Sequence, residues 1–269
     1  MPLTYADDVD IIGHNVREVS AAFSKFVEEA NRLGLTVNDE KTKYLVSTKR
    51  ESNRIGSHVA FENFNFEVVK DFIYLGVNIN SVNDISKEIT RRINLASRCY
   101  YGLNKQFSSK LLSRRSKITL YKTLILPVLM YGAETWAMSA DDEMKLGAFE
   151  RRILRKIFGP ICVHGVWRIR WNHELYEMYD EAEVVQRIKV KRLRWLGHVV
   201  RMDEENPTRK VFESRYSGGR RRQGRPNLRW FDQVSANLKS LDESNCRQRA
   251  QDRSRWRGLM DEALTCRGL

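Results

Sequence analysis

The chain has 269 residues, of which 42% are hydrophobic and 10% aromatic, so it can bury a core and does not have the composition of a disordered tail. Its longest apolar run, Leu124 to Ala133, contains Pro127 and is far shorter than the roughly 20 residues of a membrane-spanning helix. The sequence opens with no basic-then-apolar signal pattern, and its four cysteines form no CxxC pair. These features predict an intracellular protein, nuclear or cytoplasmic and not secreted, with reduced thiols and no membrane partner.

The formal net charge of +13 is unevenly distributed along the chain. Residues 1–150 hold 20 Lys+Arg against 19 Asp+Glu, whereas residues 151–269 hold 27 against 15. This asymmetry predicts a polyanionic partner, such as nucleic acid, for the second half. The alternative is a solvated basic surface that only keeps the protein soluble.

The first elements in the chain are predicted to be a strand, a tight turn and a second strand. Pro2 to Tyr5 leads into a turn at Ala6-Asp7, and the β-branched segment Val9 to Ile12 leads out. A helix then begins at Asn15, where Glu18 completes a capping-box pattern, and it ends at Gly34. Its apolar face is expected to hold Val16, Val19, Phe23, Phe26, Ala30 and Leu33.

Strands are predicted next, and helices after them. We expect a strand at Tyr44 to Thr48, a hairpin of His58 to Phe61 with Asn65 to Val69, and one strand from Phe72 to Ile79. From Ser86 the apolar period becomes helical, and the region from Leu112 to Phe158 is expected to be helical with breaks near Pro127 and Ser139. Short helices such as Glu183 to Leu196 follow in the basic part. In the helix after Ser86, the inner face should hold Ile89, Ile93, Ala96, Tyr100 and Leu103, and the outer face Arg91, Arg92 and Arg98.

The first candidate site is Tyr5-Ala6-Asp7-Asp8 on the predicted hairpin. A turn between two strands can present adjacent carboxylates, and carboxylate oxygens are the ligands that Mg²⁺ prefers. Two such ions about 3.5–4 Å apart can activate a hydroxyl nucleophile and stabilise the leaving group in phosphoryl transfer. The simpler interpretation is that two adjacent aspartates only form a turn.

Three motifs in order make this chain resemble the reverse transcriptases of non-LTR (LINE-like) retrotransposons, especially the insect type. The Tyr-Ala-Asp-Asp hairpin is followed by a helix, by Gly34-Leu35-Thr36-Val37-Asn38-Asp39-Glu40-Lys41-Thr42-Lys43, and by Phe72-Ile73-Tyr74-Leu75-Gly76. Further stretches resemble the thumb and C-terminal tail of that family: Tyr131 to Trp136, Arg192 to His198, Gly224-Arg225-Pro226 and Arg229-Trp230.

The resemblance implies an α+β fold and an RNA-directed DNA polymerase as the parent activity. Residues 1–80 would form a residual palm, residues 81–160 a helical thumb, and residues 161–269 a basic, mostly helical nucleic-acid-binding region. Asp7 and Asp8 would be the catalytic, Mg²⁺-binding carboxylates, and an RNA template and a DNA primer would be the partners. Lys41 or Lys43 would lie near the nucleotide phosphates, although both can equally be solvated loop lysines. Tyr74, Leu75 and Gly76 would form the primer grip, although the alternation around them also fits a buried strand.

The chain departs from the family pattern in one important respect. The family places at least one more catalytic aspartate well upstream of the Tyr-Ala-Asp-Asp turn, whereas only four residues precede Tyr5 here. Asp10 lies on the outgoing strand and cannot replace it. We therefore expect binding of RNA or DNA without polymerisation. One alternative is a host-retained nucleic-acid-binding or interaction protein, and another is a translated relic without a selected role. The oligomeric state is left open.

The strongest charge density lies between Arg187 and Arg229, with 14 Lys+Arg and 4 Asp+Glu. Arg220, Arg221, Arg222 and Arg225 stand among glycines and a proline, a composition that favours an extended arm whose guanidinium groups bind phosphates. A nuclear-import signal is the alternative. Tryptophans are interleaved with these charges and can either stack on unpaired bases or pack in a core: Trp167, Trp171, Trp195, Trp230 and Trp256.

Overall fold

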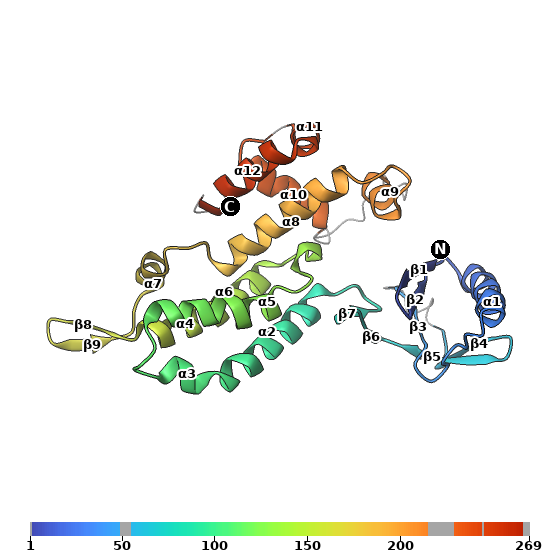
Figure 1. The fold of residues 1–269 in the computed structure, drawn as a ribbon, viewed down its shortest axis with the longest axis horizontal. Coiled ribbons are helices and arrows are strands. Elements are labelled where there is room, and N and C mark those ends of the chain that lie inside the picture. Colours follow the sequence, from blue (N-terminus) through green and yellow to red (C-terminus); the bar gives the residue numbers. More distant parts are fainter. Residues whose placement is uncertain (1, 49–54, 215–228, 244, 266–269) are drawn as a thin grey trace, which may run out of the picture. The chain divides into compact units, whose positions relative to one another are not determined.

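A computed structural model describes residues 2–48, 55–214, 229–243 and 245–265 (Figure 1). The chain has a mixed α+β fold, mostly helical with small sheets, and separates into two compact units, Met1–Asp84 and Ile85–Leu269. No helix within the described ranges is long and apolar enough to cross a bilayer.

Unit 1 packs one helix against small sheets. Strands β1 and β2 pair as an antiparallel hairpin, and a three-stranded sheet has the order β3-β5-β4. The core of this unit consists mainly of aromatic rings: Phe23 lies edge-on to Phe66 with ring centroids 5.2 Å apart, and Phe61 and Val59 complete it. The elements are β1 (Pro2–Tyr5), β2 (Asp8–Ile11), α1 (Val16–Arg32), β3 (Lys43–Leu45), β4 (His58–Phe61), β5 (Phe64–Val69), β6 (Asp71–Tyr74) and β7 (Val77–Asn80).

The predicted helix start is confirmed with one change in its bonds. The Asn15 side chain accepts the Glu18 N–H at 2.9 Å, as an N-cap residue should. The Glu18 carboxylate accepts the N–H of His14 at 3.1 Å, one residue earlier than a capping box would place it. Gly34 follows the helix with φ 73°, but Leu33 is 77% exposed, so its assignment to the apolar face was wrong.

The single strand predicted from Phe72 to Ile79 is instead a hairpin. Strands β6 and β7 pair antiparallel with Tyr74 opposite Val77, and Leu75 and Gly76 form the turn with φ 46° and 77°. Two successive positive φ values are typical of a type I′ turn, which matches the twist of hairpin strands. A buried strand here is also wrong, because Ile73 is 56% exposed.

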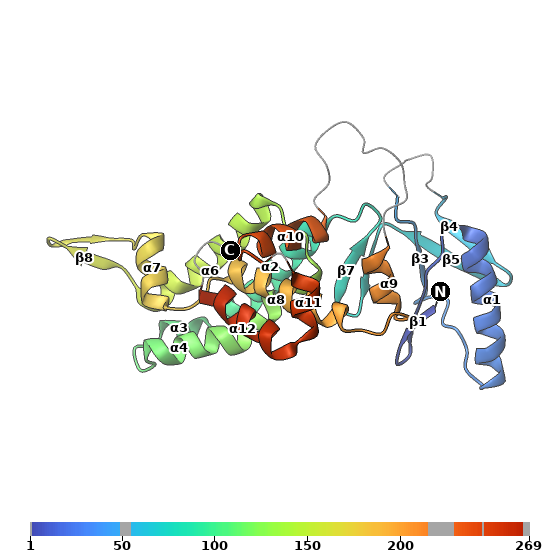
Figure 2. The same ribbon diagram turned by 90° about the horizontal axis from the view of Figure 1, so that it is seen from above.

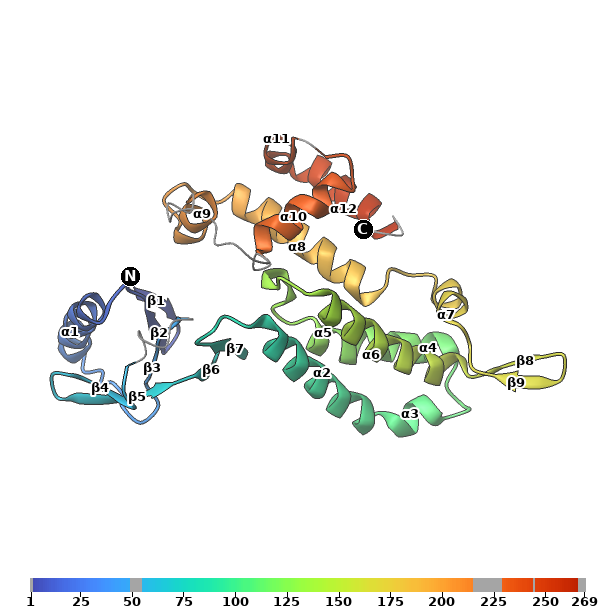
Figure 3. The same ribbon diagram turned by 180° about the vertical axis from the view of Figure 1, so that it is seen from behind.

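Unit 2 is built from helices around two hydrophobic clusters joined by one helix, α8 (Val184–Val200) (Figure 3). Val184, Val185 and Ile188 belong to the first cluster, whereas Val190, Leu193 and Leu196 belong to the second. The first cluster lies among α2 (Ile85–Gly102), α3 (Asn104–Ser108), α4 (Arg114–Leu120), a π-helical turn (Tyr121–Ile125), α5 (Leu126–Leu129), a 3-10 turn (Ala133–Thr135), α6 (Ala140–Phe158) and α7 (Asn172–Tyr179). The second lies among α10 (Trp230–Lys239), α11 (Cys246–Gln251) and α12 (Arg253–Thr265), with α9 (Pro207–Glu213) beside α8.

Both predicted helix breaks are present. The π-helical turn ends at Ile125, two residues before Pro127, whose ring would clash with the carbonyl of the preceding turn in a regular helix, and α5 ends at Leu129. Ser139 caps α6 through a capping box with Asp142.

One arginine predicted on the outer face of α2 is buried. Arg92 is only 6% exposed, and its Nε lies 2.5 Å from Oε1 of the equally buried Glu88. Its guanidinium also lies 4.5 Å from the ring centroid of Tyr131. The helical period places residue 92 on the apolar side, and the ion pair makes that burial tolerable.

A short hairpin that the sequence interpretation missed projects from unit 2. Strands β8 (Ile161–Val163) and β9 (Val166–Arg168) pair antiparallel, and Figures 1 and 2 both show them extending beyond α7, away from the helices. His164 and Gly165 form its turn with φ 50° and 80°. The signal was available in the sequence, because Val163-His164-Gly165-Val166 places a glycine turn between β-branched residues.

Candidate functional site

Asp7 and Asp8 lie at the tip of the β1–β2 hairpin and are exposed. Asp7 is in the turn, and Asp8 begins β2 opposite Tyr5. Ala6 adopts the left-handed conformation with φ 52°, which allows the chain to reverse within two residues. The predicted hairpin geometry is therefore present, and it presents two carboxylates to solvent.

Both the β6–β7 hairpin and the Asp7-Asp8 hairpin belong to unit 1. Partial burial raises the pKa of the Tyr74 phenol, and the negative charges of Asp10 and Asp8 raise that pKa further. Burial also raises the pKa of the Asp10 carboxyl. Asp8 and Asp10 are two residues apart on β2 and so share a face of the hairpin. The charges of the first motif thus act on Tyr74 of the third motif, and Leu75 and Gly76 form the turn that follows Tyr74.

A magnesium site is not assembled by these carboxylates alone. Mg²⁺ requires near-octahedral oxygen ligation, and a two-ion centre needs several carboxylates that converge on one point. Among the described residues, no three His, Cys, Asp or Glu side chains converge as a metal site would require. Asp7 and Asp8 offer oxygen atoms of the kind that Mg²⁺ prefers, but two adjacent carboxylates are fewer than a two-ion centre needs.

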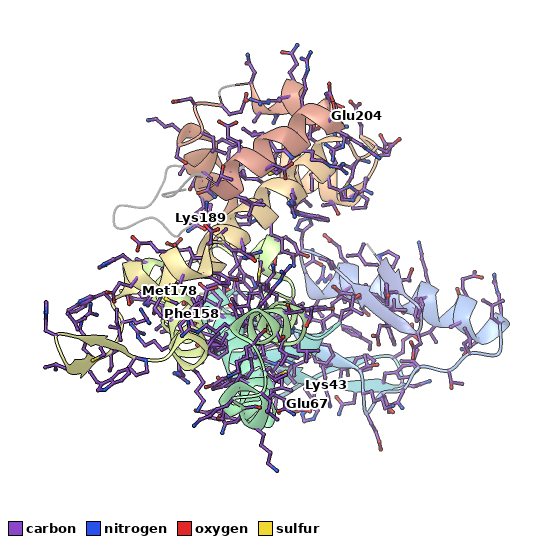
Figure 4. The ribbon with its side chains drawn as sticks, turned by 60° about the vertical axis from the view of Figure 1, so that its left-hand side comes forward. Lys43, Glu67, Phe158, Met178, Lys189 and Glu204 are labelled. Carbon is purple, nitrogen blue, oxygen red and sulfur yellow. The ribbon has the colours of Figure 1, made fainter. Side chains whose placement is uncertain are left out.

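The two candidate lysines differ in their surroundings. The Lys43 ammonium donates to Oε2 of Glu67 on the adjacent strand β5 at 2.9 Å, and Figure 4 shows the two side chains together. This pair fixes Lys43 to the sheet. Lys41 is exposed in a turn that Asn38 organises by accepting the Lys41 N–H at 3.0 Å. Lys41 is thus the more accessible of the two to a phosphate.

Many cations of the basic region hold the protein fold together. Arg187 and Lys191 on α8 pair with Glu181 at 2.5 Å and Glu134 at 2.7 Å. Arg209 pairs with both Glu204 and Glu213, and Lys210 with Glu205. The charge density between Arg187 and Arg229 therefore overstates what is available to a partner. The predicted phosphate-binding residues Arg220, Arg221, Arg222 and Arg225 lie outside the described residues.

The stretches that resemble thumb and tail motifs pack against one another. The buried Arg192 donates to the carbonyl of Trp136 at 3.1 Å and to the side chain of Gln233 on α10. Burial lowers the pKa of Arg192 to about 10, and the negative charge of Glu143 only partly opposes that shift. The Trp230 indole N–H donates to the Glu134 carbonyl at 2.7 Å. These residues have a structural role that the charge pattern alone does not reveal.

The five interleaved tryptophans fall into two groups. Trp256 is 3% exposed and donates its indole N–H to the Leu193 carbonyl at 3.1 Å, and Trp195 and Trp230 are partly buried. Core packing is thus confirmed for Trp256. Trp167 on β9 and Trp171 at the start of α7 are 69% and 61% exposed.

A buried carboxylate outside the predicted sites joins four helical segments of unit 2. Glu150 on α6 accepts from the Tyr121 hydroxyl at 2.9 Å, the Tyr176 hydroxyl at 3.2 Å and the Val184 N–H at 2.9 Å. Burial raises the pKa of Glu150 to about 7, although all three hydrogen bonds oppose that shift. No sequence motif distinguishes this glutamate from those on the helix surface.

A cavity of about 740 Å³ lies between α7, α8 and the end of α12. Its walls carry Glu177, Asp180, Glu181 and Glu183, with Arg187 as a cation. Arg187 already pairs with Glu181, so the lining is acidic and unfavourable for phosphate. The cavity is therefore not the nucleic-acid interface predicted from the charge of this half.

Comparison with known proteins relates the chain distantly to transposon products. It is 24% identical over 240 residues to a transposon-derived protein of Caenorhabditis elegans, an alignment that covers 89% of this chain and 86% of the worm protein. It is 27% identical over 169 residues to a Drosophila melanogaster protein described as an RNA-directed DNA polymerase from transposon X-element. That second alignment covers 59% of this chain and 18% of the fly protein. No family model matches the chain, and no solved structure matches it.

Proposed function

We propose that this chain is the palm-to-tail part of a retrotransposon reverse transcriptase that retains nucleic-acid binding. The observation that carries this proposal is the similarity to the X-element polymerase, together with the hairpin of Asp7 and Asp8. In this assignment residues 1–80 are residual palm, residues 81–160 are thumb, and residues 161–269 are the basic binding region. The natural partners are an RNA template and a DNA primer, and the parent reaction is RNA-directed DNA synthesis.

We further propose that the 269-residue polypeptide does not polymerise by itself. Reverse transcriptases generally require Mg²⁺, and a two-ion mechanism needs carboxylates on both sides of the reacting phosphate. Asp7 and Asp8 can contribute two ligands, while the burial that raises the Asp10 pKa disfavours its ionised form.

A primer-extension assay tests the second part of the proposal. The pure protein is incubated with an RNA template, a labelled DNA primer, dNTPs and Mg²⁺, and an established reverse transcriptase serves as the positive control. No extension is expected. Extension that requires Mg²⁺ and is abolished by Asp7→Asn would contradict the proposed lack of polymerase activity.

A second candidate function is a nucleic-acid-binding protein that no longer uses the palm. The worm relative favours this candidate, because 86% of a transposon-derived protein of similar size aligns with the chain. The two functions make different predictions for Asp7→Asn. The substitution should leave binding of a primer–template unchanged in Mg²⁺ and in EDTA if the palm is not used. It should remove a Mg²⁺-dependent gain in affinity if the palm carboxylates still take part.

A further inference from the structure

The β8–β9 hairpin and the segment that follows it to Trp171 carry large apolar side chains that no part of the described chain covers. Four large side chains within six residues are more than 60% exposed, namely Val166, Trp167, Ile169 and Trp171. Isolated exposed apolar residues are ordinary, but a cluster with two tryptophans is typical of a binding surface. Cys162, which is also exposed, pairs with Trp167 across the hairpin.

The base of the hairpin is held rigidly by three arginines. Arg168 donates through both terminal nitrogens to the Glu174 carboxylate, at 2.5 and 2.9 Å. The Arg170 Nε donates to the carbonyl of Gly159 at 3.1 Å, and Arg155 donates to the Asn172 side chain at 2.7 Å. These contacts connect the hairpin to the end of α6 and to the start of α7. A surface fixed in this way loses little conformational entropy when it binds a partner.

The orientation of Trp171 is also fixed. The Arg168 guanidinium lies 5.5 Å from the centroid of the Trp171 ring, and the Trp171 N–H donates to Glu174 at 2.7 Å. The pKa of Glu174 is lowered to about 2, first by its hydrogen bond with Arg168, so this support stays ionised at any physiological pH. The backbone of Trp171 is therefore tied to Glu174, and its exposed ring lies beside the Arg168 guanidinium.

The charge around this surface identifies the chemistry of its partner. From Arg151 to His173 the sequence holds six Lys+Arg and no Asp or Glu. Arg155 and Arg170 bond to neutral acceptors and keep their net charge. Exposed indole rings beside unneutralised cations suit unpaired nucleotides, whose bases stack while their phosphates meet the charges. A surface rich in cations is also a poor match for the basic surface of a second copy of this chain.

We propose that the β8–β9 hairpin, with Trp167 and Trp171, is a stacking element for unpaired RNA or DNA bases. This inference deepens the proposed nucleic-acid binding and rests on it. It assigns single-strand recognition to a rigid aromatic hairpin, whereas the arginines of residues 220–225 would contribute phosphate contacts without selecting strandedness. The hairpin binds a template or primer where its bases are not paired.

The test measures binding of labelled 12-nucleotide single-stranded RNA, single-stranded DNA and duplex DNA to the full 269-residue protein by fluorescence anisotropy. The Trp167→Ala/Trp171→Ala double variant is compared with Tyr101→Ala, which removes another ring that is 63% exposed. Loss of base stacking should weaken single-strand binding about tenfold or more, with little change in duplex binding or in the slope of affinity against salt. Comparison of the two single-stranded probes shows whether the hairpin prefers RNA or DNA.

Alkylation of Cys162 gives a second readout that does not depend on the double variant folding. Bound single strand should slow the reaction of the exposed Cys162 thiol in the unaltered protein, and duplex should not. A Trp167→Ala single variant, read by circular dichroism, provides a further check that the fold is kept.

The outcomes separate this inference from the proposed function. Single-strand binding that is equally tight in the double variant and in the unaltered protein would overturn the stacking role and leave the proposed function intact. Failure of the unaltered protein to bind any probe at low salt would overturn both. Concentration-dependent self-association that the double variant loses would show that a second copy covers the hairpin, which would also overturn the stacking role.

Discussion

Gly197 shows how one residue on α8 accommodates the buried tryptophan of α12. A Cβ added at Gly197 would lie 2.2 Å from Nε1 of Trp256, the atom that bonds to the Leu193 carbonyl. This contact explains a glycine in the middle of a long helix, where it otherwise costs stability. It also explains why a glycine, and not a larger residue, occurs within the Arg192 to His198 stretch.

Gly197→Ala should therefore destabilise unit 2, by about 1–3 kcal/mol, because the indole ring must move and its hydrogen bond is lost. Gly258→Ala on α12 is the matched control, since nothing lies within 4 Å of a Cβ added there. That control should stabilise the helix by roughly 0.5–1 kcal/mol. Urea unfolding measures both changes, and equal effects of the two substitutions would contradict the packing described here.

The raised pKa of Glu150 predicts that the free energy of unfolding falls as the pH rises. Its pKa in the folded protein is about 7, above its usual 4.5, so the folded state retains a proton that the unfolded state has lost between these values. The contribution of Glu150 to the free energy of unfolding is therefore fully present below pH 4.5 and is lost as the pH rises to about 7. Glu150→Gln should flatten this dependence in urea unfolding at pH 5 and pH 7.5. The exposed Glu177→Gln should not, and an unchanged profile in Glu150→Gln would count against the buried, proton-binding Glu150.

At the scale of elements, the turn of the β6–β7 hairpin carries strain that its sequence position does not reveal. Leu75 has φ 46°, a conformation that costs a non-glycine residue roughly 1 kcal/mol. Asparagine adopts this conformation more readily and is favoured in type I′ turns. Leucine at this position therefore lowers the stability of the turn relative to asparagine.

Leu75→Asn should raise the unfolding free energy of unit 1 by up to about 1 kcal/mol. Ile73→Asn provides the contrast, because residue 73 is exposed in an extended strand where asparagine is disfavoured. Hydrogen exchange of the β6–β7 amides measures both. Destabilisation by both substitutions would show that Leu75 is held by contacts stronger than its backbone strain.

Elements with strong local signals could be predicted from the sequence, and those determined by burial could not. The Asp7-Asp8 hairpin, the α1 cap at Asn15 and the break at Ser139 follow from local hydrogen bonding and turn chemistry. The hairpins at Leu75 and His164 were missed because their turns contain one glycine each and a residue that rarely has positive φ. Arg92 and Arg192 were misjudged because a charge pattern cannot show which cations find buried partners.

At the scale of the whole molecule, the candidate site was only partly accessible to sequence reasoning. Asp8 and Tyr74 both belong to unit 1, and the charge of Asp8 helps to raise the pKa of Tyr74. Charge density pointed to residues 187–229, yet many of these cations belong to ion pairs, and the exposed Trp167 and Trp171 lie outside that interval. Whether a cation is neutralised depends on tertiary contacts, which composition does not contain.

The most direct test of nucleic-acid binding is a salt series with a labelled primer–template and the full chain. Log affinity should fall steeply with log salt, with a slope that corresponds to roughly five or more phosphate contacts. Replacing Arg220, Arg221, Arg222 and Arg225 by Gln should flatten the slope. Replacing the ion-paired Arg209 and Lys210 should change it much less. Absence of binding at low salt would contradict the proposed nucleic-acid binding. An unchanged slope in the fourfold variant would contradict the proposed phosphate contacts of these arginines.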